Sequence, residues 1–203
     1  MLFELTEIIG IISFSLSGFY IAVKNDLDIL GIFISAFLTA LGGGIIRDTI
    51  LGIAPTSLVT LTPMLIVLAM VILLIVFKFY KKQDFKRKPF FVFIDSIGLA
   101  SFSISGALIA VKYDFALSGI IILSFITALG GGIFRDILIN KVPYVLKGGF
   151  YGIISIIIGV MIYFLNYINF LNFISLFGVF LFGITLRWIA FIKRWTLLKL
   201  KDD

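Results

Sequence analysis

Apolar residues form long stretches in this chain, and short polar segments separate them. The separating segments contain charged residues, proline or asparagine, and they fall at 24–28, 55, 81–89, 112–114, 140–143 and 166–172. Each apolar stretch is close to the length of about 20 residues that a helix needs to cross a bilayer. The pattern predicts seven transmembrane helices, at 5–23, 29–51, 58–80, 91–111, 117–139, 145–165 and 170–192.

The chain also repeats itself at an offset of 88 residues. The string TALGGGIIRD at 39–48 recurs as TALGGGIFRD at 127–136, and SFSLSG at 13–18 recurs as SFSISG at 101–106. Because each copy contains three helices, the second copy must enter the membrane in the opposite sense to the first. We therefore predict one all-α membrane domain over 1–203, an inverted-topology repeat of 5–80 and 91–165 with an extra helix at 170–192.

Lysine and arginine are distributed unevenly between the two sides of the predicted membrane. With the amino terminus outside, the exterior segments hold only Lys112. The cytoplasmic segments then hold Lys24, Lys78, Lys81, Lys82, Lys86, Arg87, Lys88, Lys141, Lys147, Lys193, Arg194, Lys199 and Lys201. Since basic loops favour the cytoplasmic side, we predict an N-out, C-in topology in the inner (plasma) membrane. The same placement explains the net charge of +6 without a nucleic-acid partner.

The composition narrows the classes of function. The chain is 61% hydrophobic and has a mean hydropathy of +1.20, whereas soluble domains are about half apolar. Cysteine and histidine are absent, which removes disulfides, thiolate chemistry and the commonest metal ligand. We therefore expect a protein embedded in the lipid bilayer that is not an enzyme and holds no metal or cofactor.

Three consecutive glycines occur at the same place in both copies, at Gly42, Gly43 and Gly44 and at Gly130, Gly131 and Gly132. Each glycine weakens a helix by about 1 kcal/mol relative to alanine. One interpretation is that the triplets interrupt the second and fifth helices near mid-membrane, so that backbone carbonyls face an ion or polar solute. The alternative is close helix packing, because small residues let two backbones approach.

Charged residues follow each triplet, at Arg47 and Asp48 and at Arg135 and Asp136. Charges inside a membrane are costly and usually face a cavity or one another. Because the first two helices of each copy are antiparallel, we expect Glu7 to pair with Arg47 and Asp95 to pair with Arg135. The alternative is that these residues only close the ends of each half of the bundle. In the last helix, Arg187 and Trp188 are predicted to anchor at the membrane interface.

Together these features resemble a known family. Two GGGxxRD elements, Pro55 and Pro143 a few residues further on, the three-plus-three repeat and the seventh helix are similar to the prokaryotic trimeric intracellular cation (TRIC) channels. The same group is linked by name to glycine transport. The resemblance covers about 5–192 and implies a homotrimer with one hydrophilic path in each protomer. It also implies that the second and fifth helices bend at the glycine triplets and that monovalent cations such as potassium pass.

Three functions remain open from the sequence. A cation channel would use the glycine triplets and the charged residues to line a continuous wet path. A secondary transporter for a small zwitterion such as glycine would use helix amino ends to hold the carboxylate while the two halves rock. A scaffold or membrane enzyme is the third reading, and no residue pattern in the chain supports catalysis.

Overall fold

The computed structural model describes residues 2–81, 88–147 and 150–197, and all the regular structure in these ranges is helical. The helices are α1 (Leu2–Lys24), α2 (Ile29–Ile50), α3 (Thr56–Val59), α4 (Thr62–Val76), the short 3₁₀ helix η1 (Phe79–Lys81), α5 (Lys88–Lys112), α6 (Leu117–Leu138), α7 (Tyr144–Lys147), α8 (Tyr151–Tyr167) and α9 (Phe173–Ile192). Five basic residues used above to orient the chain lie outside the described residues: Lys82, Lys86, Arg87, Lys199 and Lys201.

Five of the described helices, α1, α2, α5, α6 and α9, are long and apolar enough to cross a membrane, and α4 and α8 are shorter apolar helices. The prediction of one continuous helix over 58–80 is wrong. That segment divides into α3, α4 and η1, with Thr60 in an extended conformation between the first two. Pro63 lies in the first turn of α4, where its missing N–H removes no helical hydrogen bond. The helix predicted over 145–165 likewise divides into α7 and α8.

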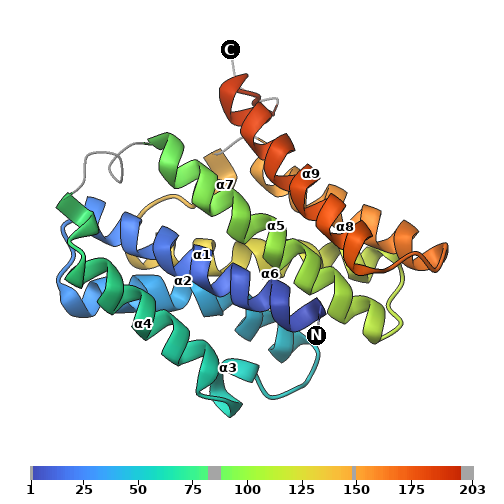
Figure 1. The fold of residues 1–203 in the computed structure, drawn as a ribbon, viewed down its shortest axis with the longest axis horizontal. Coiled ribbons are helices and arrows are strands. Elements are labelled where there is room, and N and C mark those ends of the chain that lie inside the picture. Colours follow the sequence, from blue (N-terminus) through green and yellow to red (C-terminus); the bar gives the residue numbers. More distant parts are fainter. Residues whose placement is uncertain (1, 82–87, 148–149, 198–203) are drawn as a thin grey trace.

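Four helices form the centre of the molecule. α1 packs against α5 and α2, and α6 packs against α2 and α5. α4 covers one side of this group through α1 and α2, and α8 and α9 cover the other side through α5 and α6 (Figure 1). α1 and α5 lie side by side and run in opposite directions (Figure 1).

α1 and α5 are the first helices of the two copies of the repeat, and each contributes the same kind of contact to the other. The ring of Phe14 lies against Gly98, and the ring of its equivalent, Phe102, lies against Gly10, the equivalent of Gly98. The two ring centroids are 5.2 Å apart. A β-carbon on Gly10 would be only 2.9 Å from the Phe102 ring, so the glycine makes room for the aromatic side chain. The two copies of the repeat thus contact each other through equivalent residues.

Candidate functional site

The glycine triplets lie where α2 and α6 cross, and both helices continue through them without interruption. The predicted break in these helices is therefore wrong. A β-carbon on Gly43 would collide with the carbonyl oxygen of Thr127, and one on Gly131 would collide with that of Thr39. Close backbone approach, which small residues permit, accounts for the middle glycine of each triplet. The pairing of Gly43 with Thr127 and of Thr39 with Gly131 also shows that α2 and α6 are antiparallel, so their carboxyl ends lie at opposite ends of the core.

The outer members of each triplet have different surroundings. A β-carbon on Gly42 would lie 3.1 Å from Cα of Gly131, and one on Gly130 would lie 2.6 Å from Cδ1 of Ile46, so both belong to the helix crossing. At Gly44 and Gly132, the nearest atom would be Nη2 of the arginine in the same helix, at 3.8 Å. Only the third glycine of each triplet therefore borders free space and the charged residues.

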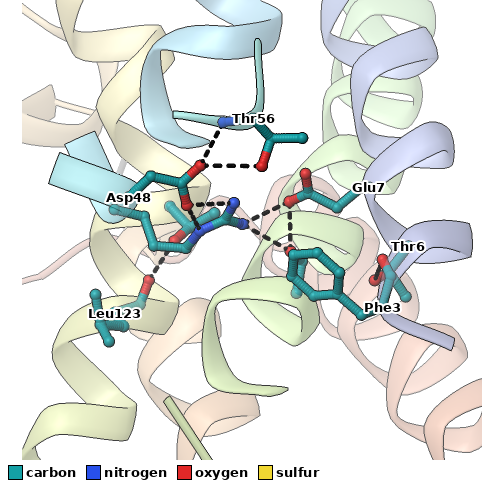
Figure 2. Close-up of polar contacts among 9 residues, drawn as sticks. Phe3, Thr6, Glu7, Asp48, Thr56 and Leu123 are labelled. Atoms are coloured by element: carbon teal, nitrogen blue, oxygen red, sulfur yellow. Dashed lines mark hydrogen bonds and ion pairs between the residues drawn. The ribbon is translucent and has the colours of Figure 1, made fainter. Parts of the chain in front are cut away.

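The first charged cluster is centred on Arg47, whose side chain is 1% exposed. Its Nη1 donates hydrogen bonds to Oε1 of Glu7 (2.5 Å) and to Oγ of Ser105 (3.0 Å), and its Nε donates to Oδ1 of Asp48 (2.8 Å). Ser105 donates in turn to Oε1 of Glu7 (2.6 Å). The predicted pair of Glu7 and Arg47 is present, and Figure 2 shows these polar contacts.

Asp48 joins this cluster to the chain that follows α2. Its Oδ2 accepts hydrogen bonds from the backbone N–H of Thr56 (3.0 Å) and from the hydroxyl of Thr56 (3.3 Å), as Figure 2 shows. The ring of Phe3 covers the guanidinium of Arg47 at 5.2 Å from its centroid. The cluster thus ties together α1, α2, α5 and the start of α3, and it does more than close the end of one half.

The second charged cluster repeats the first with equivalent residues. Nε of Arg135 donates to Oδ1 of Asp136 (2.9 Å), and the backbone N–H of Tyr144 donates to Oδ2 of Asp136 (2.8 Å). Nη1 of Arg135 reaches Oγ of Ser17 (3.4 Å), which donates to Oδ1 of Asp95 (2.9 Å). The predicted pairing of Asp95 with Arg135 is therefore made through the Ser17 hydroxyl. Asp95 is one methylene shorter than Glu7, which accounts for the intervening hydroxyl.

Ser17 and Ser105 are site residues that the sequence did not distinguish from the other serines of the repeated strings, some of which could line a path and others bond a preceding carbonyl. Each lies on the first helix of one copy and completes the charged cluster of the other copy. The available signal was the pair of strings SFSLSG and SFSISG, which places a serine at both positions. The neighbouring Ser15 and Ser103 instead donate to carbonyl oxygens four residues back, so their hydroxyls are already satisfied within the helix.

A small cavity adjoins each cluster. Gly44, Glu7, Arg47 and Asp48 are among the residues that line a cavity of about 20 Å³ at the first cluster. Gly132, Asp95, Arg135 and Asp136 are among those that line one of about 10 Å³ at the second. A cavity needs a volume of roughly 10–15 Å³ to hold one water molecule. Each cavity therefore has room for about one water, too little for a hydrated ion.

Arg187 does not anchor at an interface, as the sequence reasoning predicted, because only 3% of it is exposed. Its Nη2 donates to the hydroxyl of Tyr144 (3.0 Å), and its guanidinium lies over the ring of Tyr151 at 4.8 Å. It therefore packs behind the second charged cluster, which contains the backbone N–H of Tyr144.

Comparisons with known proteins identify similar sequences and similar folds. A family model described as Glycine transporter matches the chain twice, at residues 4–81 and 92–167, which is the same 88-residue offset. The UPF0126 membrane protein YvgT of Bacillus subtilis (strain 168) is 38% identical over 162 residues, which make up 80% of each chain.

Two solved structures share the fold over almost the whole chain. The first, described as "Structural basis for conductance through TRIC cation channels", is 33% identical, with a TM-score of 0.87 and coverage of 100% of this chain and 99% of that one. The second, a prokaryotic TRIC channel in 0.5 M KCl, is 32% identical, with a TM-score of 0.87 and coverage of 97% and 99%. These matches point to a non-enzymatic membrane protein. The chain therefore belongs to the family described as Glycine transporter, the family of the prokaryotic TRIC channels, and is a multi-pass membrane protein.

Proposed function

We propose that this protein is a channel for monovalent cations, potassium among them, with one path through each protomer. The path runs between α1, α2, α5 and α6, from the first charged cluster past Gly44 and Gly132 to the second. The observation that carries the proposal is the pair of buried charged clusters at opposite ends of the α2–α6 crossing. Each cluster holds two carboxylates and one guanidinium, and these three groups by themselves carry an excess of one negative charge. Negative charge in a low-dielectric passage raises the local concentration of cations.

The proposed topology has seven spans, with α4 and α8 added to the five longer helices. The antiparallel packing of α1 with α5 and of α2 with α6 supports an inverted three-plus-three repeat, with α9 as the seventh span. The bias of basic residues supports N-out, C-in in the inner (plasma) membrane. In this orientation, the first cluster lies toward the outside and the second toward the cytoplasm.

The proposed assembly is a homotrimer. The two solved neighbours described above are TRIC channels, which supports a trimer here. Large apolar side chains are exposed on several helices, among them Ile34 on α2, Ile122 on α6 and Phe177 on α9, and these faces are available to lipid and to neighbouring protomers.

Conduction through this path requires the clusters to open. Each cavity has room for about one water, and the contacts of Arg47 with Glu7 and of Arg135 with Ser17 close the space beside Gly44 and Gly132. A rotation of either arginine side chain would widen its end of the path. The described conformation is therefore the closed one in this proposal.

A transporter of glycine is the second candidate, because the matching family model bears that name. Purified protein in planar bilayers with a potassium gradient separates the two. The channel predicts stepwise currents that reverse near the potassium equilibrium potential. Saturable, gradient-coupled uptake of glycine into liposomes, in protein that gives no such currents, would overturn the channel and establish the transporter.

A further inference from the structure

Arg187 on α9 is a buried cation that lies outside the 88-residue repeat. Its Nη2 donates to the hydroxyl of Tyr144, and among the residues that the structure describes its buried Nε has no hydrogen-bond partner. Its guanidinium is flanked by the rings of Tyr151 at 4.8 Å and Tyr144 at 5.6 Å. Within residues 2–81, 88–147 and 150–197, it forms no ion pair with a carboxylate. A buried charge without an opposite charge in contact is costly to the free energy of folding.

Two tyrosines place this charge directly behind the second cluster. Tyr144 accepts a hydrogen bond from Arg187 through its hydroxyl and donates one to Asp136 through its backbone N–H, at 2.8 Å. Tyr151 lines the same small cavity as Asp95. The guanidinium is therefore buried beside the second cluster, where its positive charge acts on the cluster across a short, weakly screened distance.

The first cluster has no such charge at the corresponding place. The residues equivalent to Tyr144 and Tyr151 are Thr56 and Pro63, and in the described part of the chain neither takes part in a hydrogen bond or cation–π contact with a cation. The first cluster therefore has an excess of one negative charge. Arg187 cancels the same excess at the second cluster.

We propose that Arg187 makes conduction through the protein asymmetric. This inference rests on the proposed cation channel. The fixed positive charge lowers the concentration of cations at the second cluster, so cations enter more readily from the first. Because the charge is buried, dissolved salt screens it less than it would screen a surface charge. In the N-out, C-in orientation, inward potassium current should exceed outward current at equal and opposite voltages.

The test compares Arg187→Met, which removes the charge, with Arg187→Lys, which keeps it. The protein is incorporated in planar bilayers with equal KCl on both sides, and the ratio of inward to outward current is measured. Because the chain has no cysteine, a single cysteine at the exposed Asn166, modified by a membrane-impermeant thiol reagent, reports the orientation.

The wild type is expected to pass more inward than outward current. Arg187→Met should bring the ratio of inward to outward current close to one. The expected change in this ratio is about threefold or more, because one charge at intermediate dielectric has an interaction energy of that order. Arg187→Lys should keep the wild-type ratio, whereas a purely structural role would make both variants assemble poorly and leave the ratio unmoved. If the Met variant does not assemble, Arg187→Gln makes the same charge change with a donor for Tyr144.

An assembled neutral variant with the wild-type ratio, or a wild type that conducts equally in both directions, overturns the inference alone. A wild type that passes no cation current overturns the proposed function, and the inference with it.

Discussion

Alanine substitutions in the glycine triplets can distinguish an effect on helix packing from an effect on ion permeation. The middle glycine of each triplet is closely packed against backbone, whereas the third glycine borders free space. In the variant Gly43→Ala with Gly131→Ala, each new methyl meets backbone. At Gly131 it would lie 2.7 Å from the carbonyl oxygen of Leu38 and still closer to that of Thr39. Backbone cannot rotate away as a side chain can, so we place each site at the upper end of the range of about 1–3 kcal/mol for overpacking. The gain in helix propensity is about 1 kcal/mol per site. The double variant should therefore lose about 2–4 kcal/mol of stability.

The variant Gly44→Ala with Gly132→Ala should behave in the opposite way. Each new methyl would find its nearest neighbour at 3.8 Å, an ordinary contact, so stability should be unchanged or higher by up to about 1 kcal/mol per site. The methyl would, however, occupy the space of about one water beside each arginine. We expect potassium flux to fall roughly tenfold, which corresponds to about 1.4 kcal/mol of added barrier.

The assay pairs thermal melting of the purified protein with potassium flux in liposomes. Gly178→Ala is a matched control. Gly178 lies on α9, away from the proposed path, and a β-carbon there would have no atom within 4 Å beyond its chain neighbours and the local helix backbone. The reasoning is refuted if Gly43→Ala with Gly131→Ala melts like the wild type. It is also refuted if Gly44→Ala with Gly132→Ala is stable and conducts normally.

Three further predictions concern the clusters and the assembly. Glu7→Gln should lower the free energy of unfolding by about 3–5 kcal/mol, because it leaves the buried Arg47 with one fewer carboxylate. Asp95→Asn should lower it less, since Ser17 lies between Asp95 and Arg135. Denaturation of both variants in mild detergent checks this order, and equal losses would contradict it. Ser105→Ala should lower the free energy of unfolding by about 1–2 kcal/mol, and it should raise the open probability in single-channel records because Arg47 loses a hydrogen bond. Ser15→Ala should leave gating unchanged, because the Ser15 hydroxyl bonds only within α1. Similar gating in both variants would count against a role for the cluster. Native mass measurement should give a trimer, and a stable monomer that still conducts would remove the assembly from the proposal.

The sequence predicted the charged contacts within one copy better than those between copies. Glu7 and Arg47 could be paired from helix direction alone, because consecutive antiparallel helices bring their outer ends together. The repeat identifies which residues are equivalent, but it does not say which surfaces the two copies present to each other. For that reason Ser17 and Ser105, which bond across the interface of the copies, could not be distinguished from the other serines of the repeated strings.

The glycines and Arg187 were misread for a related reason. Three glycines in a row have the same low helix propensity whether they break a helix or pack it, and only the position of Thr39 and Thr127 on the crossing helix decides between the two. Arg187 near the end of an apolar helix looks like an interface anchor until Tyr144 and Tyr151 are placed over it. Tertiary neighbours decide both cases.

The exchange of Ser17 and Ser105 means that neither half of this protein is chemically complete. Residues 2–81 alone would contain Arg47 without the hydroxyl that Ser105 supplies, and residues 88–167 would contain Arg135 without Ser17. A single unit could nevertheless complete its cluster by pairing reciprocally with a second copy of its own kind, since each copy carries the serine that the other needs. The two copies in the present chain thus contact each other as the subunits of a symmetric homodimer would, and Arg187 on α9 lies beside the second cluster, outside that reciprocal exchange.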